Sequence, residues 1–450
     1  MKLVVTHPSI RVLFFALLLS TAAFGQNSAT TASIEGTVRD TAGKFVPNAS
    51  VAAKDIATGQ IRNATTDSDG VYRLPALAVS TYELRITSPG FADFTRSDVT
   101  LTLAQTMTLD VTLQPAGVNS VVEVSDNASD MDPSETAVAT SITTENVEEL
   151  PVKDRNYLQF ALVAPGVAPS NTHTPTGAGG ALASPLEDSG FSFGGLRTRS
   201  NSIVIDGLTN IDETTGAALV ALSPEIVREF QVVNNGISAE FGGAAGGTIN
   251  VITKTGSNQY HGTLFTFFQN QRFDARNPFD AKRRLYHAYQ PGFSLGGPLR
   301  KDRLFFYVSA EQEHQISNDE PEIARSIRTQ INTALGAGFA PRLAVRSLQG
   351  STFRSGRDQT EAAGKLTWIV DKTNTANFRF AFTNNRERAD AFDTTTLDDP
   401  SSRGSVYSKD YQVTASLSSV LNPAAINEAR FQVSQRSFIS RAGDQTGPEI

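Results

Sequence analysis

The sequence has no cysteine, which excludes disulfide bonds and thiolate-bound metal ions. Charged residues are scarce, at 19% of the chain against about 25% in ordinary soluble proteins. The formal net charge of -7 lacks the basic excess of nucleic-acid-binding proteins, which excludes a nucleic-acid partner. No nucleophile, base and orienting group gather in one motif, so we expect neither an enzyme nor a cofactor. The five histidines lack ligand spacing, which predicts no metal centre: His7, His173, His261, His287 and His314.

The chain also lacks an apolar run of the ~20 residues that a membrane-spanning helix needs. The apolar run Val12 to Leu19 is far shorter, and Lys2 and Arg11 precede it. Small residues follow at Ala23-Phe24-Gly25, where a signal peptidase would cut. We therefore predict that residues 1–25 are a secretory signal peptide and that the chain is exported.

Residues 32–113 contain several short strand patterns separated by turns. Tyr82, Leu84 and Ile86 alternate with polar residues, and the turn Thr66 to Gly70 leads into another apolar alternation. Strands at this spacing predict a small β-sandwich. Asp67 and Asp69 are a turn pair, because a calcium loop needs further oxygen donors and none follow Gly70.

The sequences GTVRDTAGKFVPNASV, TTDSDGVYRLPAL and YELRI in this segment resemble the carboxypeptidase regulatory-like domain. That family is a prealbumin-like sandwich of the carbohydrate-binding-like superfamily. The resemblance implies a fold and leaves open whether the sandwich binds a ligand.

A second β-rich pattern lies between residues 193 and 256. Ile203 to Ile205 predicts a buried strand closed by a turn at Asp206-Gly207, and Ile226 to Val233 and Thr248 to Thr253 predict two more. Four glycines precede the last strand and predict close packing of backbone: Gly242, Gly243, Gly246 and Gly247. A phosphate-binding loop is excluded because no Gly-Lys-Ser/Thr follows.

The stretch FGGLRTRSNSIVIDGLTNIDETTGAALVALSPEIVREFQVVNNGISAEFGGAAGGTINVITKTG resembles the plug of a TonB-dependent outer-membrane receptor. The resemblance assigns residues 131–256 to an α+β plug, in which Thr143 to Asn146 would cap a short helix, Val147 to Leu150. It implies polar contacts between plug and barrel wall, for which a fold-holding and a ligand-binding role are equally open. The candidate plug contacts are Arg197, Asn201, Asp206, Gly207, Arg228, Glu229 and Glu240.

Residues 114–130 form a polar linker with one apolar island, Val121, Val122, Glu123 and Val124. Such a segment can add as a strand to the sheet edge of a partner. In the family that the plug resembles, this is where the box that binds periplasmic TonB would lie. An ordinary linker strand is an equally open alternative.

Beyond Gly256, aromatic-rich segments alternate apolar and polar residues, as Phe378, Phe380 and Phe382 do. One apolar and one polar face is what a barrel strand between lipid and a wet lumen requires, although a soluble sandwich shows the same period. The blocks HGTLFTFFQNQRFDARNPFD and GFSLGGPLRKDRLFFYVSAEQ resemble the first barrel hairpins of Oar-like TonB-dependent receptors. An excursion over residues 318–358, with a short helix at Ile323, Ile327 and Ile331, is expected on the extracellular side.

A barrel of about 22 strands at ~10 residues each needs more than the 194 residues that follow Gly256. We therefore expect residues 257–450 to be the first part of a barrel, either in a fragment of a longer receptor or in a chain that cannot close a barrel alone.

The predicted fold class is mainly β: signal peptide, prealbumin-like sandwich, α+β plug, and the N-terminal part of a transmembrane β-barrel. The predicted function is an outer-membrane receptor that uses TonB to take up an unidentified substrate, with a carbohydrate or another nutrient as candidates. A secreted or surface carbohydrate-binding or adhesion protein that uses the sandwich is the alternative.

Overall fold

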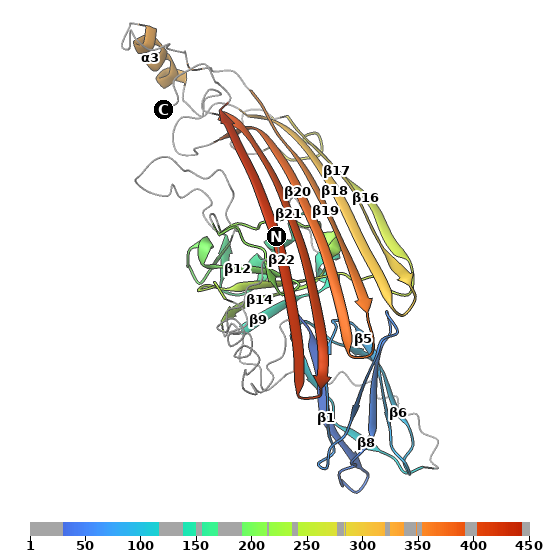
Figure 1. Ribbon diagram of the computed structural model, residues 1–450. Coiled ribbons are helices and arrows are strands. Elements are labelled where there is room, and N and C mark those ends of the chain that lie inside the picture. Colours follow the sequence, from blue (N-terminus) through green and yellow to red (C-terminus); the bar gives the residue numbers. More distant parts are fainter. Residues whose placement is uncertain are drawn as a thin grey trace, which may run out of the picture.

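The computed structural model describes residues 30–116, 138–149, 155–169, 191–213, 216–235, 242–276, 283, 285–319, 325–336, 348, 353–391 and 403–442. The predicted signal peptide, the island Val121 to Val124 and Glu240 lie outside these residues. The described chain forms a small sandwich, a middle body and a large curved sheet, in that order along the sequence (Figure 1). No helix among the described residues is long and apolar enough to cross a membrane.

The first body is the predicted sandwich. One sheet has the order β4-β1-β7, with β8 also paired to β1, and the other has the order β3-β2-β5-β6. Alternate residues such as Val51, Leu84 and Ile86 are fully buried between the sheets. The Asp67 carboxylate accepts the N–H groups of Asp69 and Val71, both at 2.9 Å, as a turn residue does. The strands are β1 Ala32–Asp40, β2 Ser50–Asp55, β3 Ile61–Thr65, β4 Val71–Leu77, β5 Thr81–Thr87, β6 Phe94–Thr100, β7 Thr106–Thr108 and β8 Val111–Leu113.

The middle body, here called the plug, is built on a sheet of order β13-β12-β15-β14-β9. The expected strands are confirmed as β12 Ser202–Ile205, β14 Val227–Asn235 and β15 Thr248–Thr253. The remaining elements are β9 Val138–Ile142, α2 Thr144–Glu149, η2 Tyr157–Val163, β10 Val167–Pro169, β11 Phe191–Phe193, η3 Thr198–Ser200, β13 Leu208–Thr209 and η4 Pro224–Ile226.

Two boundaries in the plug differ from the prediction. Helix α2 begins at Thr144, three residues before the expected start, because the Asn146 side chain already accepts the N–H of Thr143 at 3.2 Å. Strand β14 begins at Val227, one residue late, because Ile226 ends a 3-10 turn that Ser223 caps.

Two of the four glycines before β15 have the close packing that was expected. A Cβ on Gly247 would lie 2.3 Å from a ring carbon of Phe193, and one on Gly246 would lie 2.8 Å from Asn201 Oδ1. Gly242 and Gly243 face open space, so close packing explains only the glycines next to the strand.

The third body is a seven-stranded antiparallel sheet that runs from β16 to β22 in sequence order. Its strands are β16 His261–Asn270, β17 Tyr286–Arg300, β18 Leu304–Asp319, β19 Phe353–Ile369, β20 Asn374–Ala391, β21 Arg403–Asn422 and β22 Ala425–Ala442. The three short turns after β17, β19 and β21 lie at the sandwich end, and β16, β18 and β20 end at the opposite side of the sheet (Figure 1). The β18–β19 connection carries helix α3 Arg325–Gly336, which includes Ile327 and Ile331 of the predicted helix, and Ile323 lies outside the described residues.

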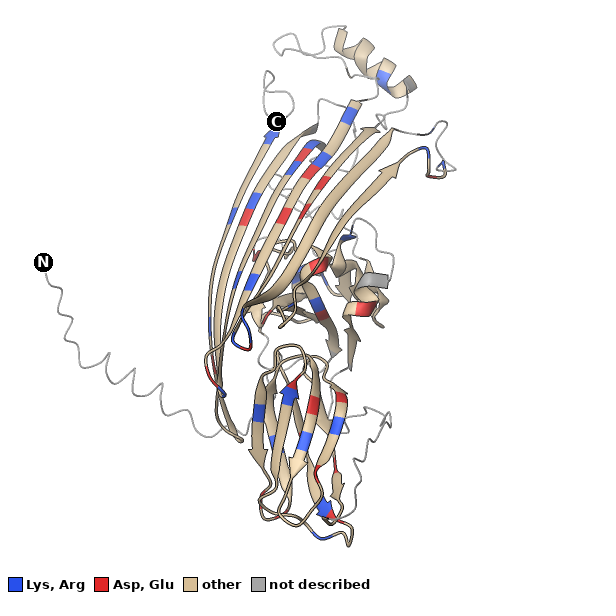
Figure 2. Cartoon of the chain, turned by 90° about the vertical axis from the view of Figure 1, so that its right-hand side faces the viewer, with Lys and Arg blue, Asp and Glu red and all other residues tan. Residues whose placement is uncertain are grey.

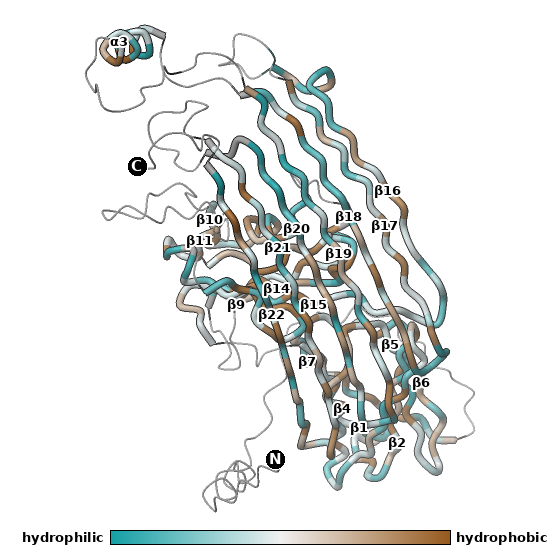
Figure 3. The backbone as a smooth tube through the Cα atoms, turned by 45° about the horizontal axis from the view of Figure 1, so that its top comes forward, coloured by the Kyte–Doolittle hydropathy of each residue, from teal (hydrophilic) through white to brown (hydrophobic). Residues whose placement is uncertain are grey.

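The concave face of this sheet packs against the plug and is mostly polar, whereas its other face is apolar. Arg379 and Gln412 are buried on the inner face, while Trp368, Phe378 and Phe431 are between 44% and 62% exposed on the outer face. Along the strands, hydropathy changes from hydrophobic near the sandwich to hydrophilic at the far end (Figure 3). The predicted alternation is therefore confirmed, with the apolar side chains outward.

Candidate functional site

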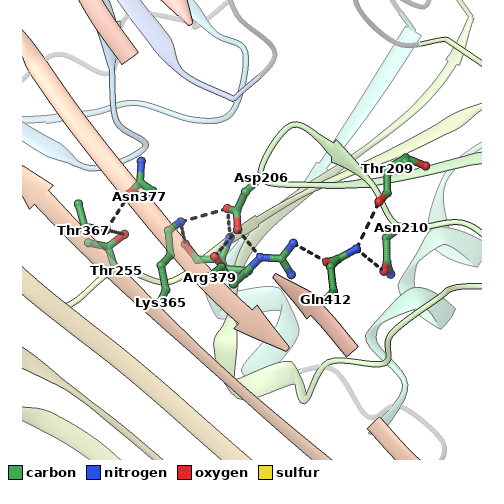
Figure 4. Close-up of polar contacts among 10 residues, drawn as sticks. Asp206, Thr209, Asn210, Thr255, Lys365, Thr367, Asn377, Arg379 and Gln412 are labelled. Carbon is green, nitrogen blue, oxygen red and sulfur yellow. Dashed lines mark hydrogen bonds and ion pairs between the residues drawn. The ribbon is translucent and has the colours of Figure 1, made fainter. Parts of the chain in front are cut away.

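The contact between the plug and the concave face is organised around Asp206 (Figure 4). Strand β12 ends at Ile205, and Asp206 and Gly207 turn the chain with φ values of 51° and 79°. This turn directs the Asp206 carboxylate at the sheet, where Oδ1 lies 3.0 Å from Lys365 Nζ and Oδ2 lies 3.1 Å from Arg379 Nε. Thr253, on the neighbouring strand β15, donates its N–H and its hydroxyl to the same carboxylate.

The charges at Asp206 are shielded from water. The side chains of Lys365 and Arg379 are only 8% and 2% exposed. Burial by itself raises the pKa of the Asp206 carboxyl, but Lys365, Arg379 and the Thr253 hydrogen bonds lower it by more. The net pKa lies below the usual range of aspartate, so the carboxylate is charged at neutral pH and holds the two cations in place.

Arg379 extends the contact toward a second plug strand. Its Nη2 donates to Gln412 Oε1 at 2.7 Å, and the Gln412 amide lies 3.3 Å from the carbonyl oxygen of Thr209 and 3.4 Å from Asn210 Oδ1. The turn of the β12–β13 hairpin, at Asp206, and the end of β13, at Thr209, therefore both contact the sheet (Figure 4).

A second ionic contact forms at Arg155. Its guanidinium lies 2.9 Å from carboxylate oxygens of both Glu225 and Glu311. The same guanidinium lies 4.5 Å from the ring centres of Phe265 and Phe267, so it links the plug to β16 as well as to β18.

A third ionic contact forms at Arg436 of β22. Its guanidinium lies 2.7 Å from Asp212 of the plug and 2.8 Å from Asp410 of β21. It also donates to the carbonyl oxygens of Ala218 and Leu219. Charged residues accordingly recur along the inner strands and the plug (Figure 2).

A cavity of about 310 Å³ lies between the plug and the strands, beside the contacts of Arg155 and Arg436. Its plug wall consists of residues 155–159 and 217–222, and its sheet wall includes Glu311, Glu361 and Asn385. The cavity is polar and its walls belong to both bodies, so any displacement of the plug opens it. Among the described residues, no three His, Asp or Glu side chains are grouped so that they could hold a metal ion.

The sandwich touches both other bodies. Leu103 of the sandwich donates its N–H to Glu229 Oε1 of the plug at 3.0 Å, and Leu103 packs with Val79 and with Ile252 of the plug. Asn258, between plug and sheet, donates to the carbonyl oxygens of Ala57 and Thr58, both at 2.9 Å. Arg62 donates to the carbonyl oxygen of Lys372 in the β19–β20 turn.

Glu229 makes the sandwich contact sensitive to pH. Burial raises the pKa of its carboxyl, although the Leu103 N–H and Arg228 oppose this shift. The docked state therefore keeps a proton at pH values where a free glutamate, with a pKa of about 4.3, has lost it. This contribution to the stability of the folded chain is fully present below that ordinary pKa and is lost as the pH rises through the raised one.

The other predicted plug contacts have different places. Asn201 is buried and donates to the carbonyl oxygen of Phe191 within the plug. Gly207 lies against Thr30 and the Arg430 guanidinium of β22. The carbonyl oxygen of Arg228 accepts the Thr144 hydroxyl, and Arg197 is exposed. Of the described candidates, the structure brings Asp206 and Gly207 to the sheet and Glu229 to the sandwich.

Sequence reasoning missed the charged residues on the strands that face the plug. The strongest are Lys365 and Arg379, whose side chains are 8% and 2% exposed and pair with Asp206. The third is Arg436, which pairs with Asp212 of the plug. Charged residues on the polar side of the apolar–polar alternation were the signal that could have found them.

Two domain families match the chain. The carboxypeptidase regulatory-like domain matches residues 33–114, and the outer membrane beta barrel domain matches residues 252–334. The TonB-dependent transporter Oar of Myxococcus xanthus is 29% identical over 311 residues, which is 65% of this chain and 27% of that transporter. The probable TonB-dependent siderophore receptor PirA of Acinetobacter baumannii is 28% identical over 148 residues, 33% of this chain and 17% of that receptor. The chain thus spans less than a third of the length of these relatives.

Among solved structures, the outer membrane transporter YddB from Escherichia coli aligns with a TM-score of 0.46 at 13% identity, covering 66% of this chain and 38% of that one. The siderophore receptor PirA from Acinetobacter baumannii aligns with a TM-score of 0.42 at 17% identity, covering 66% and 43%. By the two domain matches and the alignment with Oar, the chain is similar to outer-membrane, Oar-like TonB-dependent transporters and contains a carboxypeptidase regulatory-like domain at residues 33–114.

Proposed function

We propose that this chain forms the N-terminal part of a transporter that takes up its substrate across the outer membrane when TonB displaces the plug. Its segments would be the signal peptide 1–25, the sandwich 32–113, the linker 114–130, the plug 131–256 and the first part of the barrel 257–450. The substrate is unidentified, and a carbohydrate or another nutrient is the kind of molecule we propose.

One observation carries this proposal: the sheet has an apolar outer belt and a polar inner face that holds the plug by buried ion pairs. Across five neighbouring strands, four successive rows of outward residues are almost entirely apolar. The row from Leu304 to Ala429 is the one nearest the sandwich, and the row from Ala310 to Gln435 is the farthest. At about 3.4 Å per residue these rows cover roughly 20 Å, close to the ~25 Å apolar band of a membrane barrel.

Polar rows bound the belt on both sides. Gln312, Thr360, Asn384, Lys409 and Ser437 follow one another across the strands above it. Asn374, Ser419 and Asn427 do so below it. A soluble sandwich would cover its apolar face with a second sheet, whereas here Trp368 and Phe431 remain 52% and 62% exposed. This exposed belt favours a bilayer and disfavours the secreted binding protein.

The inner face explains why such a transporter would need energy. Displacing the plug breaks the contacts of Asp206, Arg155 and Arg436 with the sheet. Separating one buried charge from its partner typically costs about 3–5 kcal/mol, so thermal motion alone rarely opens three such contacts. A pull by TonB on the segment between sandwich and plug would supply this energy from the inner membrane.

The partner contact is tested at the apolar island Val121 to Val124. Purified receptor in detergent should bind the periplasmic domain of TonB. Val122→Pro should abolish binding, because proline removes a backbone donor from a strand added to a sheet edge. Val122→Thr, which keeps the donor and the β-branch, should bind like the wild type.

Equal TonB binding by the proline variant would place the contact elsewhere. Recovery of the wild-type protein in the soluble periplasmic or secreted fraction would reject the transport proposal and support the binding protein that uses the sandwich.

A further inference from the structure

The outer belt contains a hollow at its sandwich end. The hollow has a volume of about 520 Å³ and an almost wholly apolar lining. Large side chains of β19 to β22 form its walls, among them Trp368, Phe378, Leu417 and Phe431. The residues that line the hollow all belong to β18–β22, and none of them belongs to the plug or the sandwich.

Cross-strand register creates the hollow. Trp368 pairs with Ala376, Ala376 with Leu417, and Leu417 with Ala429, so large and small side chains alternate along the row. In the next row, Ala415 sits between Phe378 and Phe431. Three alanines thus form a floor below walls of aromatic and leucine side chains.

We propose that this hollow binds one acyl chain of a glycerophospholipid of the inner leaflet of the outer membrane. The proposal rests on the proposed function, in which TonB pulls from the inner-membrane side on the segment between sandwich and plug, so that the sandwich end of the sheet faces the periplasm. The hollow lies inside the apolar belt, so hydrocarbon is what surrounds it in the bilayer. A slender apolar chain fills a groove between side chains better than it covers a flat belt, because it gains contacts on three sides.

The position of the hollow selects the leaflet. It lies in the two belt rows nearest the short turns, on the side where Arg62 and Asn258 join the sandwich to the sheet. That side faces the periplasm in the proposed orientation, and phospholipid rather than lipopolysaccharide occupies the corresponding leaflet. The turns there also carry Lys301, Arg303 and Lys372, cations at the level of a phosphate headgroup.

Filling the floor tests the proposal without making the belt less apolar. The variant Ala415→Leu with Ala429→Leu adds bulk inside the hollow. The matched control is Ala362→Leu, the same change on the same face in the belt row farthest from the sandwich. Receptor is purified from outer membranes in mild detergent, and bound phospholipid per chain is counted by native mass spectrometry.

Trp368 provides a second readout because it is the only tryptophan in these 450 residues. Delipidated receptor in detergent is titrated with phosphatidylethanolamine that is brominated on its acyl chains, and quenching of Trp368 is followed. We expect about one retained phospholipid per chain and saturable quenching for the wild type and Ala362→Leu. The filled variant should lose the retained lipid and require at least tenfold more brominated lipid for the same quenching.

The proposal is overturned if the filled variant retains lipid and is quenched like the wild type, or if the wild type retains none. Retention of lipopolysaccharide in place of phospholipid overturns the leaflet assignment. Failure of the transport proposal would look different, because the protein would then be absent from the outer-membrane fraction from which the lipid is counted.

Discussion

The substitution Asp206→Asn tests whether buried ion pairs hold the plug in the sheet. Asparagine keeps the size and one acceptor of aspartate but removes the charge that Lys365 and Arg379 face at 3.0 and 3.1 Å. At an effective dielectric constant of about 20, each pair at this distance is worth roughly 5 kcal/mol before desolvation is subtracted. Removing one partner of such a buried group typically costs about 3–5 kcal/mol, because the remaining cations stay buried without compensation.

Hydrogen exchange of the β15 amides in the purified receptor measures this loss. Protection should fall by about 100- to 4,000-fold in Asp206→Asn, since 1.4 kcal/mol corresponds to a factor of ten. Because the pKa of Asp206 is depressed, wild-type protection that depends on this charge should hold from pH 7 to pH 5. Asp93→Asn is the control, since it breaks an exposed ion pair with Arg85 on the sandwich and should leave β15 unchanged.

A triple variant separates charge from packing. Asp206→Asn combined with Lys365→Met and Arg379→Leu removes the buried cations together with the carboxylate, and asparagine tolerates the positive φ of 51° at this turn. We expect it to regain most of the protection lost in Asp206→Asn. If Asp206→Asn itself keeps β15 protection within tenfold of the wild type, the ion pairs do not hold the plug and the reasoning is wrong.

Three further predictions concern the plug and its sandwich contact. Gly247→Ala should destabilise the plug by about 1–3 kcal/mol in denaturant unfolding, because its Cβ would overlap an aromatic ring, whereas Gly242→Ala in open space should change little. Protection of the sandwich N–H of Leu103, which Glu229 accepts, should decrease as the pH rises through the raised pKa of Glu229, and Glu229→Gln should remove this dependence. An unchanged pH profile would exclude the carboxyl as its source. Gly59→Ala should weaken docking of the sandwich and raise its protease sensitivity, because φ at Gly59 is +75° and the new Cβ would lie 2.7 Å from Asp302 Oδ1. Combining it with Asp302→Ala should restore part of the protease resistance. Equal protease sensitivity of the wild type and both variants would contradict this.

Much of the fold was predictable from local sequence. The strands alternate with a period of two, so their apolar faces and the sandwich core could be assigned from the order of the residues alone. The turn at Asp206-Gly207 was equally readable, because both residues tolerate positive φ. The glycines before β15 were predicted to pack closely as a group, and local sequence could not tell that only Gly246 and Gly247 meet another chain segment.

The partners of the site depended on tertiary structure. Asp206 and Lys365 are 159 residues apart, and Leu103 and Glu229 are 126 residues apart, distances over which no local pattern specifies contact. The hollow has the same origin, since Ala376, Ala415 and Ala429 look unrelated until strand register places them side by side. The sequence by itself therefore determined which residues lie on the apolar face and which on the polar face of each strand, because side-chain direction follows from strand periodicity. Only the tertiary structure decided which inward charge meets which plug residue, because strand order and register bring distant segments together.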